Sequence, residues 1–203
     1  MADTKDNLLI LDLDETLIHA SDCSLSTPAD FTIGRFHIYH RPHLRQFLAA
    51  CFDWFEVAFW TSSSEAYATA VATAILPATQ KLAFFWSRNR CTAAYDPDLM
   101  EQYWKKNLTK VRRRGYRLEK VIVVDDSPEK WTGSYGNLVL VKPFTGETEE
   151  DDELLFLLSY LEVLRKEDNI RKVDKRNWKS SSVRMREQYP SISKPSRGPA
   201  RSV

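Results

Sequence analysis

The chain has 203 residues, of which 43% are hydrophobic, and its 29 basic and 28 acidic side chains give a formal net charge of +1. This length suits one domain with its own core, and the balance of charge gives no general sign of a polyanionic partner. Three widely spaced cysteines without a CxxC pair indicate neither a disulfide framework nor a zinc knuckle. The N-terminus is polar and no stretch approaches the roughly 20 apolar residues of a membrane span, so we expect a cytoplasmic protein without membrane insertion, or a nuclear one if it is eukaryotic.

Apolar segments alternate with segments of helical periodicity along the chain. Short apolar or β-branched runs predict a hairpin at 31–42 and strands at 8–11, 55–60, 81–86, 121–124 and 137–141. Apolar residues at helical spacing predict helices at 43–52, 64–76, 154–166 and at least part of 96–115, with hydroxyl side chains after residue 60 as candidate caps. This alternation favours an α/β fold, a Rossmann-like and mainly parallel sheet with helices on both faces.

Polar side chains come directly after three of the predicted strands. Asp12 and Asp14 come after the first strand, Thr61 after the second, and Asp125 and Asp126 after the strand that ends at residue 124. Because ligands of such sheets collect beyond the carboxyl ends of the strands, we expect these side chains to meet in one crevice. Converging carboxylates repel each other unless a cation lies among them, and oxygen ligands without His or Cys fit Mg²⁺. A magnesium site is therefore predicted at this edge of the sheet.

The same residue types suit phosphoryl transfer. A carboxylate can act as the nucleophile and form an aspartyl-phosphate, and Mg²⁺ would screen its repulsion from the phosphate. A second carboxylic acid two residues away could protonate the departing oxygen and then activate water. Thr61 and a lysine of the WKKN segment are available to bind the phosphate oxygens.

Four motifs occur in order along the chain: DLDETL at 12–17, FWT at 59–61, Lys106 in KKNL, and VVDDSP at 123–128. They resemble the signatures of haloacid dehalogenase superfamily phosphatases. With RPHLRQFL and RNRC, they are most similar to the FCP/SCP (NLI-interacting-factor) family, phosphatases of phosphoserine or phosphothreonine in proteins such as the RNA polymerase C-terminal domain. The resemblance covers about residues 6–175, and DLDETL followed by DDSP is its most specific part.

This resemblance implies a role for each matching residue. Asp12 would be the nucleophile and a metal ligand, and Asp14 the general acid and base that also offers its backbone carbonyl to Mg²⁺. Thr61 and Lys106 would hold the phosphate. The other expected site residues are Asp126 as a further metal ligand, Asp125 beside it to orient the metal site, Thr16 to stabilise the loop after the nucleophile, and Ser62 as a possible phosphate ligand.

The register of two motifs leaves alternatives open. Lys105 adjoins Lys106, and either lysine of the WKKN segment could reach the phosphate. Ser62 or Ser63 could replace Thr61 if the preceding strand ends a residue later.

The spacing of the motifs bears on the substrate. About 20 residues separate the first motif from IYHRP and about 45 separate Thr61 from Lys106, which leaves room for a small β insert but for no large cap domain. An open site would admit a phosphorylated side chain of a protein. We therefore predict a Mg²⁺-dependent phosphoserine/phosphothreonine phosphatase that works through an aspartyl-phosphate. The rival hypotheses are a phosphatase of nucleic-acid ends or small phosphate esters, and a non-catalytic binding module on the same fold.

The end of the chain differs in composition from the predicted phosphatase domain, residues 1–178. Residues 179–203 carry six basic residues against one acid and show no apolar periodicity, which predicts a basic and largely disordered tail. The tail could bind nucleic acid, but its charge alone does not favour this over a tail that is simply exposed to solvent.

Overall fold

Five parallel strands form the central sheet of the computed structural model, which describes residues 6–77, 79–97, 100–146 and 151–182. Their order is β10-β9-β1-β5-β6, and every neighbouring pair is parallel. The predicted mainly parallel sheet is thereby confirmed. The strands are β1 (Leu8–Leu11), β5 (Glu56–Trp60), β6 (Phe85–Trp86), β9 (Val121–Asp125) and β10 (Leu138–Leu140).

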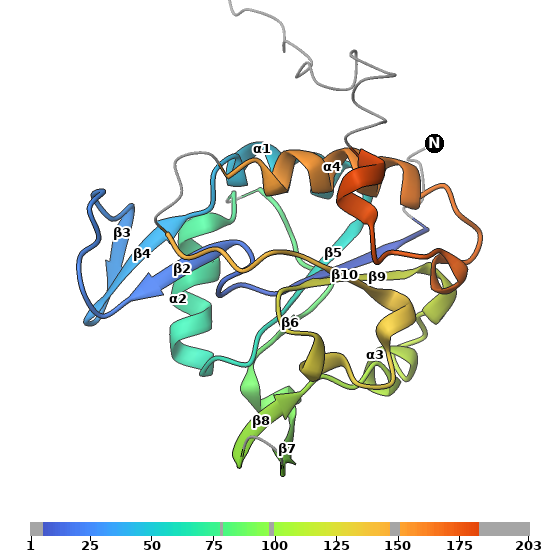
Figure 1. Cartoon of the computed structure of the whole chain (residues 1–203), viewed down its shortest axis with the longest axis horizontal. Coiled ribbons are helices and arrows are strands. Elements are labelled where there is room, and N and C mark those ends of the chain that lie inside the picture. Colours follow the sequence, from blue (N-terminus) through green and yellow to red (C-terminus); the bar gives the residue numbers. More distant parts are fainter. Residues whose placement is uncertain (1–5, 78, 98–99, 147–150, 183–203) are drawn as a thin grey trace, which may run out of the picture.

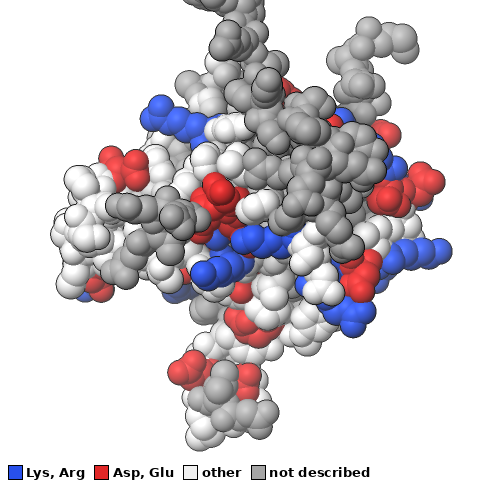
Figure 2. All heavy atoms as spheres, turned by 45° about the horizontal axis from the view of Figure 1, so that its top comes forward, with Lys and Arg blue, Asp and Glu red and all other residues white. Residues whose placement is uncertain are grey.

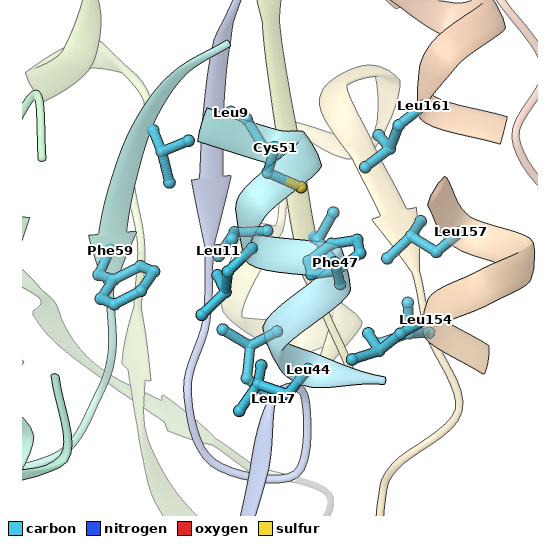
Figure 3. Packing of buried hydrophobic residues seen from close by; sticks show 14 of the residues in the cluster. Leu9, Leu11, Leu17, Leu44, Phe47, Cys51, Phe59, Leu154, Leu157 and Leu161 are labelled. Atoms are coloured by element: carbon cyan, nitrogen blue, oxygen red, sulfur yellow. The ribbon is translucent and has the colours of Figure 1, made fainter. Parts of the chain in front are cut away.

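Helices cover both faces of this sheet, as predicted (Figure 1). Alternate residues of β1 face opposite sides, so Leu9 and Leu11 belong to one core and Leu8 and Ile10 to the other. The first core contains buried residues of α1 (Leu44–Trp54), α2 (Glu65–Ile75) and α4 (Glu153–Leu164), and Figure 3 shows α1 lying over the strands beside α4. The second core packs against the short helix α3 (Thr109–Arg112).

Three tryptophans build the second core close to the carboxyl ends of the strands. The ring of Trp60 meets Trp86 edge-on with centroids 4.7 Å apart, and it meets Trp131 in the same way at 5.5 Å. Edge-to-face pairs of this kind add to the stabilisation that comes from burial alone. Trp60 and Trp86 end β5 and β6, so these ring contacts lie at the carboxyl ends of the two strands.

A small antiparallel sheet comes after the first motif. It has the order β2-β4-β3, formed by β2 (Ile18–Ser21), β3 (Phe31–Ile33) and β4 (Phe36–His40). The hairpin β3–β4 agrees with the prediction for 31–42, and Gly34 turns it with a φ of +58°. This sheet is the small β insert, and no large cap domain is present among the described residues.

A second hairpin corrects the helix predicted within 96–115. Strands β7 (Thr92–Asp96) and β8 (Glu101–Lys105) pair antiparallel, and Figure 1 shows them projecting below the central sheet. The helical prediction is wrong over β8 because this segment has no apolar stripe to bury, and its aromatic residues Tyr103 and Trp104 favour a strand. Helix remains only in α3, after the lysine motif.

The last described residues pack against α4, where the Trp178 ring lies 5.8 Å from that of Tyr160. Residues 178–182 are helical, with Trp178 and Ser182 buried, and Lys179 forms an ion pair with Glu153. The predicted disordered tail otherwise lies outside the described residues, from 183 onward. Within the part of the chain that the structure describes, no helix is both long and apolar enough to cross a membrane. All three cysteines are free thiols.

Candidate active site

The carboxyl ends of three neighbouring strands bring the predicted residues together. Residues Phe59, Leu11 and Val124 are paired across β5, β1 and β9, so the loops after these strands leave from the same edge of the sheet. Asp12 comes directly after β1, and its backbone N–H donates to Val124 O at 3.0 Å. Thr61 comes directly after β5, and its N–H donates to the carbonyl of β6 at 2.9 Å. Backbone hydrogen bonds therefore hold the main chain of Asp12 and Thr61 in position independently of their side-chain contacts.

A tight loop carries the chain from the first strand past the site. Glu15 has a φ of +56°, and its N–H donates to Ile18 O at 2.7 Å. Thr16 is fully buried, and its Oγ1 donates to Asp126 Oδ1 at 3.3 Å. Arg41 donates to the carbonyl of Thr16 at 3.1 Å. Thr16 thus links the loop to the last motif, and its role in stabilising the loop stays a prediction.

Asp12, Asp125 and Asp126 form the acidic group of the site. One carboxylate oxygen from each lies within 4.8 Å of the others. Burial, and then the charge of Asp125, raise the pKa of Asp12 to about 6, and the same two causes raise the pKa of Asp126. Burial therefore disfavours the charged forms of Asp12 and Asp126 first, and the neighbouring charge of Asp125 adds to this effect.

This acidic group fits a hard divalent cation. All of its donors are carboxylate oxygens, the ligand type that Mg²⁺ prefers, and two of the three side chains are buried. Asp12 Oδ1 is buried, and its partner among the described residues is the Lys106 ammonium at 2.9 Å, so the oxygen already lies in surroundings that favour a positive ligand. Asp14 does not belong to this trio, and a role for it toward the metal remains the predicted backbone contact.

Lys106 supplies the buried positive charge. Its Nζ lies 2.9 Å from Asp12 Oδ1 and 2.5 Å from Asp125 Oδ2, and its side chain is 0% exposed. Burial opposes its charge, but the two carboxylates outweigh this effect and raise the pKa of Lys106. Of the two lysines that the sequence left open, Lys106 is therefore the one placed among the acids, whereas Lys105 ends β8.

Asp125 is the most tightly held acid of the site. Its Oδ2 accepts from Trp131 Nε1 at 2.8 Å as well as from Lys106, and its Oδ1 accepts from Ser127 N at 2.9 Å. Burial alone would raise its pKa, but Lys106 and Lys130 hold that pKa below the usual range. Asp125 therefore stays ionised and holds Lys106 in position, and its role in orienting the metal site stays a prediction.

Asp14 lies in a separate nest of hydroxyl groups. Its Oδ2 accepts from Ser63 Oγ at 2.6 Å and from Thr61 Oγ1 at 3.4 Å, and its Oδ1 accepts from Tyr67 OH at 2.7 Å. The serines after β5 were predicted as helix caps, but Ser64 at the N-cap of α2 makes no side-chain cap bond. Ser63 instead directs its hydroxyl to Asp14. Ser62 lies between Thr61 and Ser63 in the chain, and its carbonyl accepts from Arg88 Nε at 2.7 Å. Its expected role as a phosphate ligand stays a prediction.

The sequence analysis assigned no role toward the acids to three residues of this arrangement. Tyr67 lies on the first turn of α2, where its spacing from Thr61 indicated only a helix, and Trp131 and Lys130 come after the DDSP motif. Lys130 Nζ lies 3.7 Å from Asp12 Oδ2. The acidic, basic and indole groups gathered in DDSPEKW would have been the clue, because a short turn after a strand end keeps all of them close to the acids.

Comparison with known proteins identifies the family of this chain. The family model for NLI interacting factor-like phosphatases matches residues 7–171. The CTD nuclear envelope phosphatase 1 homolog of Drosophila melanogaster is 30% identical over 184 residues, which cover 83% of this chain and 72% of the relative. The human CTD small phosphatase-like protein is 31% identical over 170 residues, which cover 80% of this chain and 57% of the relative.

A solved structure shares the fold. The structure of Fcp1, described as an essential RNA polymerase II CTD phosphatase, superposes with a TM-score of 0.54 at 19% identity. It covers 90% of this chain, but this chain covers only 62% of Fcp1. The match of fold therefore extends over nearly the whole chain, whereas much of Fcp1 has no counterpart in it. From the family model and these relatives, the chain belongs to the NLI interacting factor-like phosphatase family.

Proposed function

We propose that the protein is a Mg²⁺-dependent phosphatase that removes phosphate from phosphoserine or phosphothreonine in proteins through an aspartyl-phosphate. The observation that supports this most directly is the position of Asp12. It emerges from the end of β1, is buried, and lies against the Lys106 ammonium and two further carboxylates. A nucleophilic carboxylate needs such surroundings, because its own charge and that of a phosphate repel each other.

The metal would be held by Asp12 and Asp126, with Asp125 beside them and the backbone carbonyl of Asp14 as the further ligand implied by the family resemblance. When bound, Mg²⁺ supplies positive charge that screens the approach of the phosphate to the carboxylates. The protein contributes the remaining positive charge through Lys106, which is already ordered by Asp12 and Asp125. Because these contacts already hold the Lys106 ammonium in position, it does not have to move when the phosphate reacts.

In the first step, an oxygen of Asp12 attacks phosphorus and the bond from phosphorus to the seryl or threonyl oxygen breaks. The leaving oxygen takes the bond's electron pair and a proton from Asp14. The protein then carries a mixed anhydride on Asp12, and Asp14 is ionised. Ser63 and Tyr67 hold the Asp14 carboxylate in place, which favours transfer along one direction.

In the second step, Asp14 takes a proton from water, and the water oxygen attacks phosphorus. The bond from phosphorus to the Asp12 oxygen breaks, inorganic phosphate leaves, and both carboxyl groups return to their starting states. Thr61 Oγ1 and the Lys106 ammonium, which contact Asp14 and Asp12, would bind the equatorial phosphate oxygens during both steps.

The substrate class rests on the relatives and on the inserts. The relatives are named as CTD phosphatases, and Fcp1 is described as a phosphatase of the RNA polymerase II CTD. The described inserts are only a three-stranded sheet and a hairpin. Figure 2 shows basic and acidic side chains interspersed on the face it displays, which gives no support to a nucleic-acid track among the described residues there. A cytoplasmic or nuclear location remains a prediction.

Replacement Asp12→Asn tests the mechanism, with Asp53→Asn on α1 as the matched control. Wild-type protein and Asp53→Asn should hydrolyse an aryl phosphate and a phosphoserine peptide with Mg²⁺, and Asp12→Asn should hydrolyse neither. Mass spectrometry of acid-quenched wild type should find a phosphoryl group on the peptide that contains Asp12. Activity of Asp12→Asn would contradict the mechanism. A preference for a 3′-phosphorylated oligonucleotide that weakens steeply with salt would overturn the substrate class instead.

A further inference from the structure

Lys130 is a second cation at the nucleophile, beside the carboxylate oxygen that Lys106 does not contact. Its Nζ lies 3.7 Å from Asp12 Oδ2, whereas Lys106 Nζ contacts Oδ1 of the same carboxylate. It also lies 3.9 Å from Asp125 Oδ1. The two ammonium groups therefore face different oxygens of the same pair of acids.

The two lysines differ in the donors that remain available for a ligand. Lys106 is 0% exposed, and it is hydrogen-bonded to Asp125 and packed 5.4 Å above the Trp131 ring. The Lys130 side chain is 18% exposed, and its ammonium makes no hydrogen bond to the described residues, since its carboxylate neighbours are beyond hydrogen-bond distance. An ammonium has three donors, so Lys130 can offer more of them to a ligand than Lys106, which already directs donors to two acids.

The backbone holds the two lysines together. Lys130 lies on the short 3-10 segment Pro128–Trp131, and its carbonyl accepts from Lys106 N at 2.7 Å. The same segment is anchored by Trp131, whose indole donates to Asp125. Lys130 therefore approaches the acids from a fixed base, unlike a lysine on a free surface.

The negative charge of the site exceeds the positive charge that Lys106 and one divalent ion would supply. Asp12, Asp14, Asp125 and Asp126 carry up to four negative charges, and Lys106 and one divalent ion would supply three positive ones. A bound phosphate ester adds up to two further negative charges. Electrostatic stabilisation of the transferring group dominates phosphoryl transfer, so an extra cation beside the nucleophile has a direct use.

We propose that Lys130 binds an oxygen of the transferring phosphate and is a second phosphate-binding cation of this site. This inference rests on the proposed function, because it assigns a role toward the same phosphate. The ammonium would donate to the phosphate oxygen that points away from Lys106, so that the two lysines hold the group between them. The partial exposure of Lys130 leaves its donors accessible to a substrate that arrives from solvent.

The test compares wild type with Lys130→Met, Lys130→Arg and the control Lys166→Met, which changes an exposed lysine after α4. Binding of inorganic phosphate is measured by calorimetry at saturating Mg²⁺, and KM and kcat are measured with an aryl phosphate. Lys130→Met should weaken phosphate binding and raise KM by about tenfold or more, as expected for the loss of one charge-assisted hydrogen bond. Lys130→Arg should recover part of this loss, and Lys166→Met should match wild type.

Other outcomes would reject the role of Lys130. Unchanged phosphate affinity in Lys130→Met contradicts it, and so does a gain in Mg²⁺ affinity alone, which would make Lys130 a competitor of the metal. Melting curves and a second variant, Lys130→Gln, separate these results from misfolding. Failure of the proposed function would appear differently, as a wild-type protein that does not turn over any phosphate ester. The calorimetric binding of inorganic phosphate would still test Lys130 in that case.

Discussion

The Lys106 ammonium and the Asp12 carboxylate form a buried ion pair, with Nζ 2.9 Å from Oδ1 and neither side chain more than 2% exposed. Each charge is removed from water, so each depends on the other for compensation. A pair of this kind is costly to break from one side. Loss of Lys106 should therefore lower both the stability of the domain and the reactivity of the proposed nucleophile, and both effects can be measured in one variant.

Lys106→Met should lower activity by at least about 100-fold, because the phosphate loses a fixed cation. The same change removes the buried partner of Asp12 and Asp125 and leaves them only the more distant Lys130 ammonium, which should cost up to about 3–5 kcal/mol of unfolding free energy when Mg²⁺ is absent. Urea unfolding and steady-state kinetics would measure both effects. Lys105→Met is the matched control and should show neither. Equal loss in both variants would mean that the assignment of the lysine is wrong.

Removal of one acid should change the response to Mg²⁺. The metal binds the folded protein and not the dispersed acids of the unfolded chain, so it should raise the melting temperature of wild type by mass action, worth about 2.7 kcal/mol at a hundredfold excess over Kd. Asp126→Asn should need more Mg²⁺ for the same rise and for half-maximal activity. Asp53→Asn is the control. A melting temperature of wild type that does not respond to Mg²⁺ would argue against a metal at this trio.

Much of the fold was accessible from the sequence because its central elements have strong and local signals. The run Leu8–Leu11 is entirely apolar and entirely buried, and its strand end determines where Asp12 emerges. The parallel arrangement then predicts that Asp125 and Thr61 emerge beside it. The principal site residues can be located from this single property of parallel sheets, without knowledge of any side-chain contact.

The rest depended on contacts between distant segments. Strand β8 has polar residues at both ends and exists because β7 pairs with it, so no local periodicity revealed it. Strand β2 was also missed, since His19 and Ser21 look like loop residues until β4 lies beside them. Similarly, Tyr67 is an ordinary helix residue in the sequence. Only the packing of α2 against the first motif brings its hydroxyl to Asp14.

Tyr67→Phe should separate positioning of the proposed general acid from substrate binding. The change removes only the hydroxyl that donates to Asp14 Oδ1 at 2.7 Å and keeps the ring that packs on Phe36. We expect kcat to fall by roughly tenfold, the equivalent of one hydrogen bond of about 1.4 kcal/mol, with little change in KM. Tyr135→Phe, at an exposed tyrosine, is the control. A rise in KM at constant kcat would assign Tyr67 to substrate binding instead.

Lys175 provides a pH-dependent contribution to stability away from the active site. Its Nζ donates to the carbonyls of Ile170 at 2.5 Å and of Val173 and Gly136 at 2.8 Å, and burial lowers the pKa of Lys175 to about 8. In the unfolded chain Lys175 has the ordinary pKa of a lysine, about 10.4. Between these two values the unfolded chain binds more protons than the folded one, so this group makes stability rise with pH across that window.

Replacement Lys175→Met should remove this rise and leave three carbonyls without their donor. At pH 7 the variant should be less stable by roughly 1–3 kcal/mol, since buried acceptors lose their partner. From pH 8 to pH 10 the difference in unfolding free energy between wild type and variant should widen, because only the wild type gains from releasing a proton. Urea unfolding at each pH measures that difference and cancels the titration of groups shared by both proteins. A constant difference across this range would show that Lys175 keeps an ordinary pKa in the fold, with its three carbonyl contacts offsetting the cost of burial.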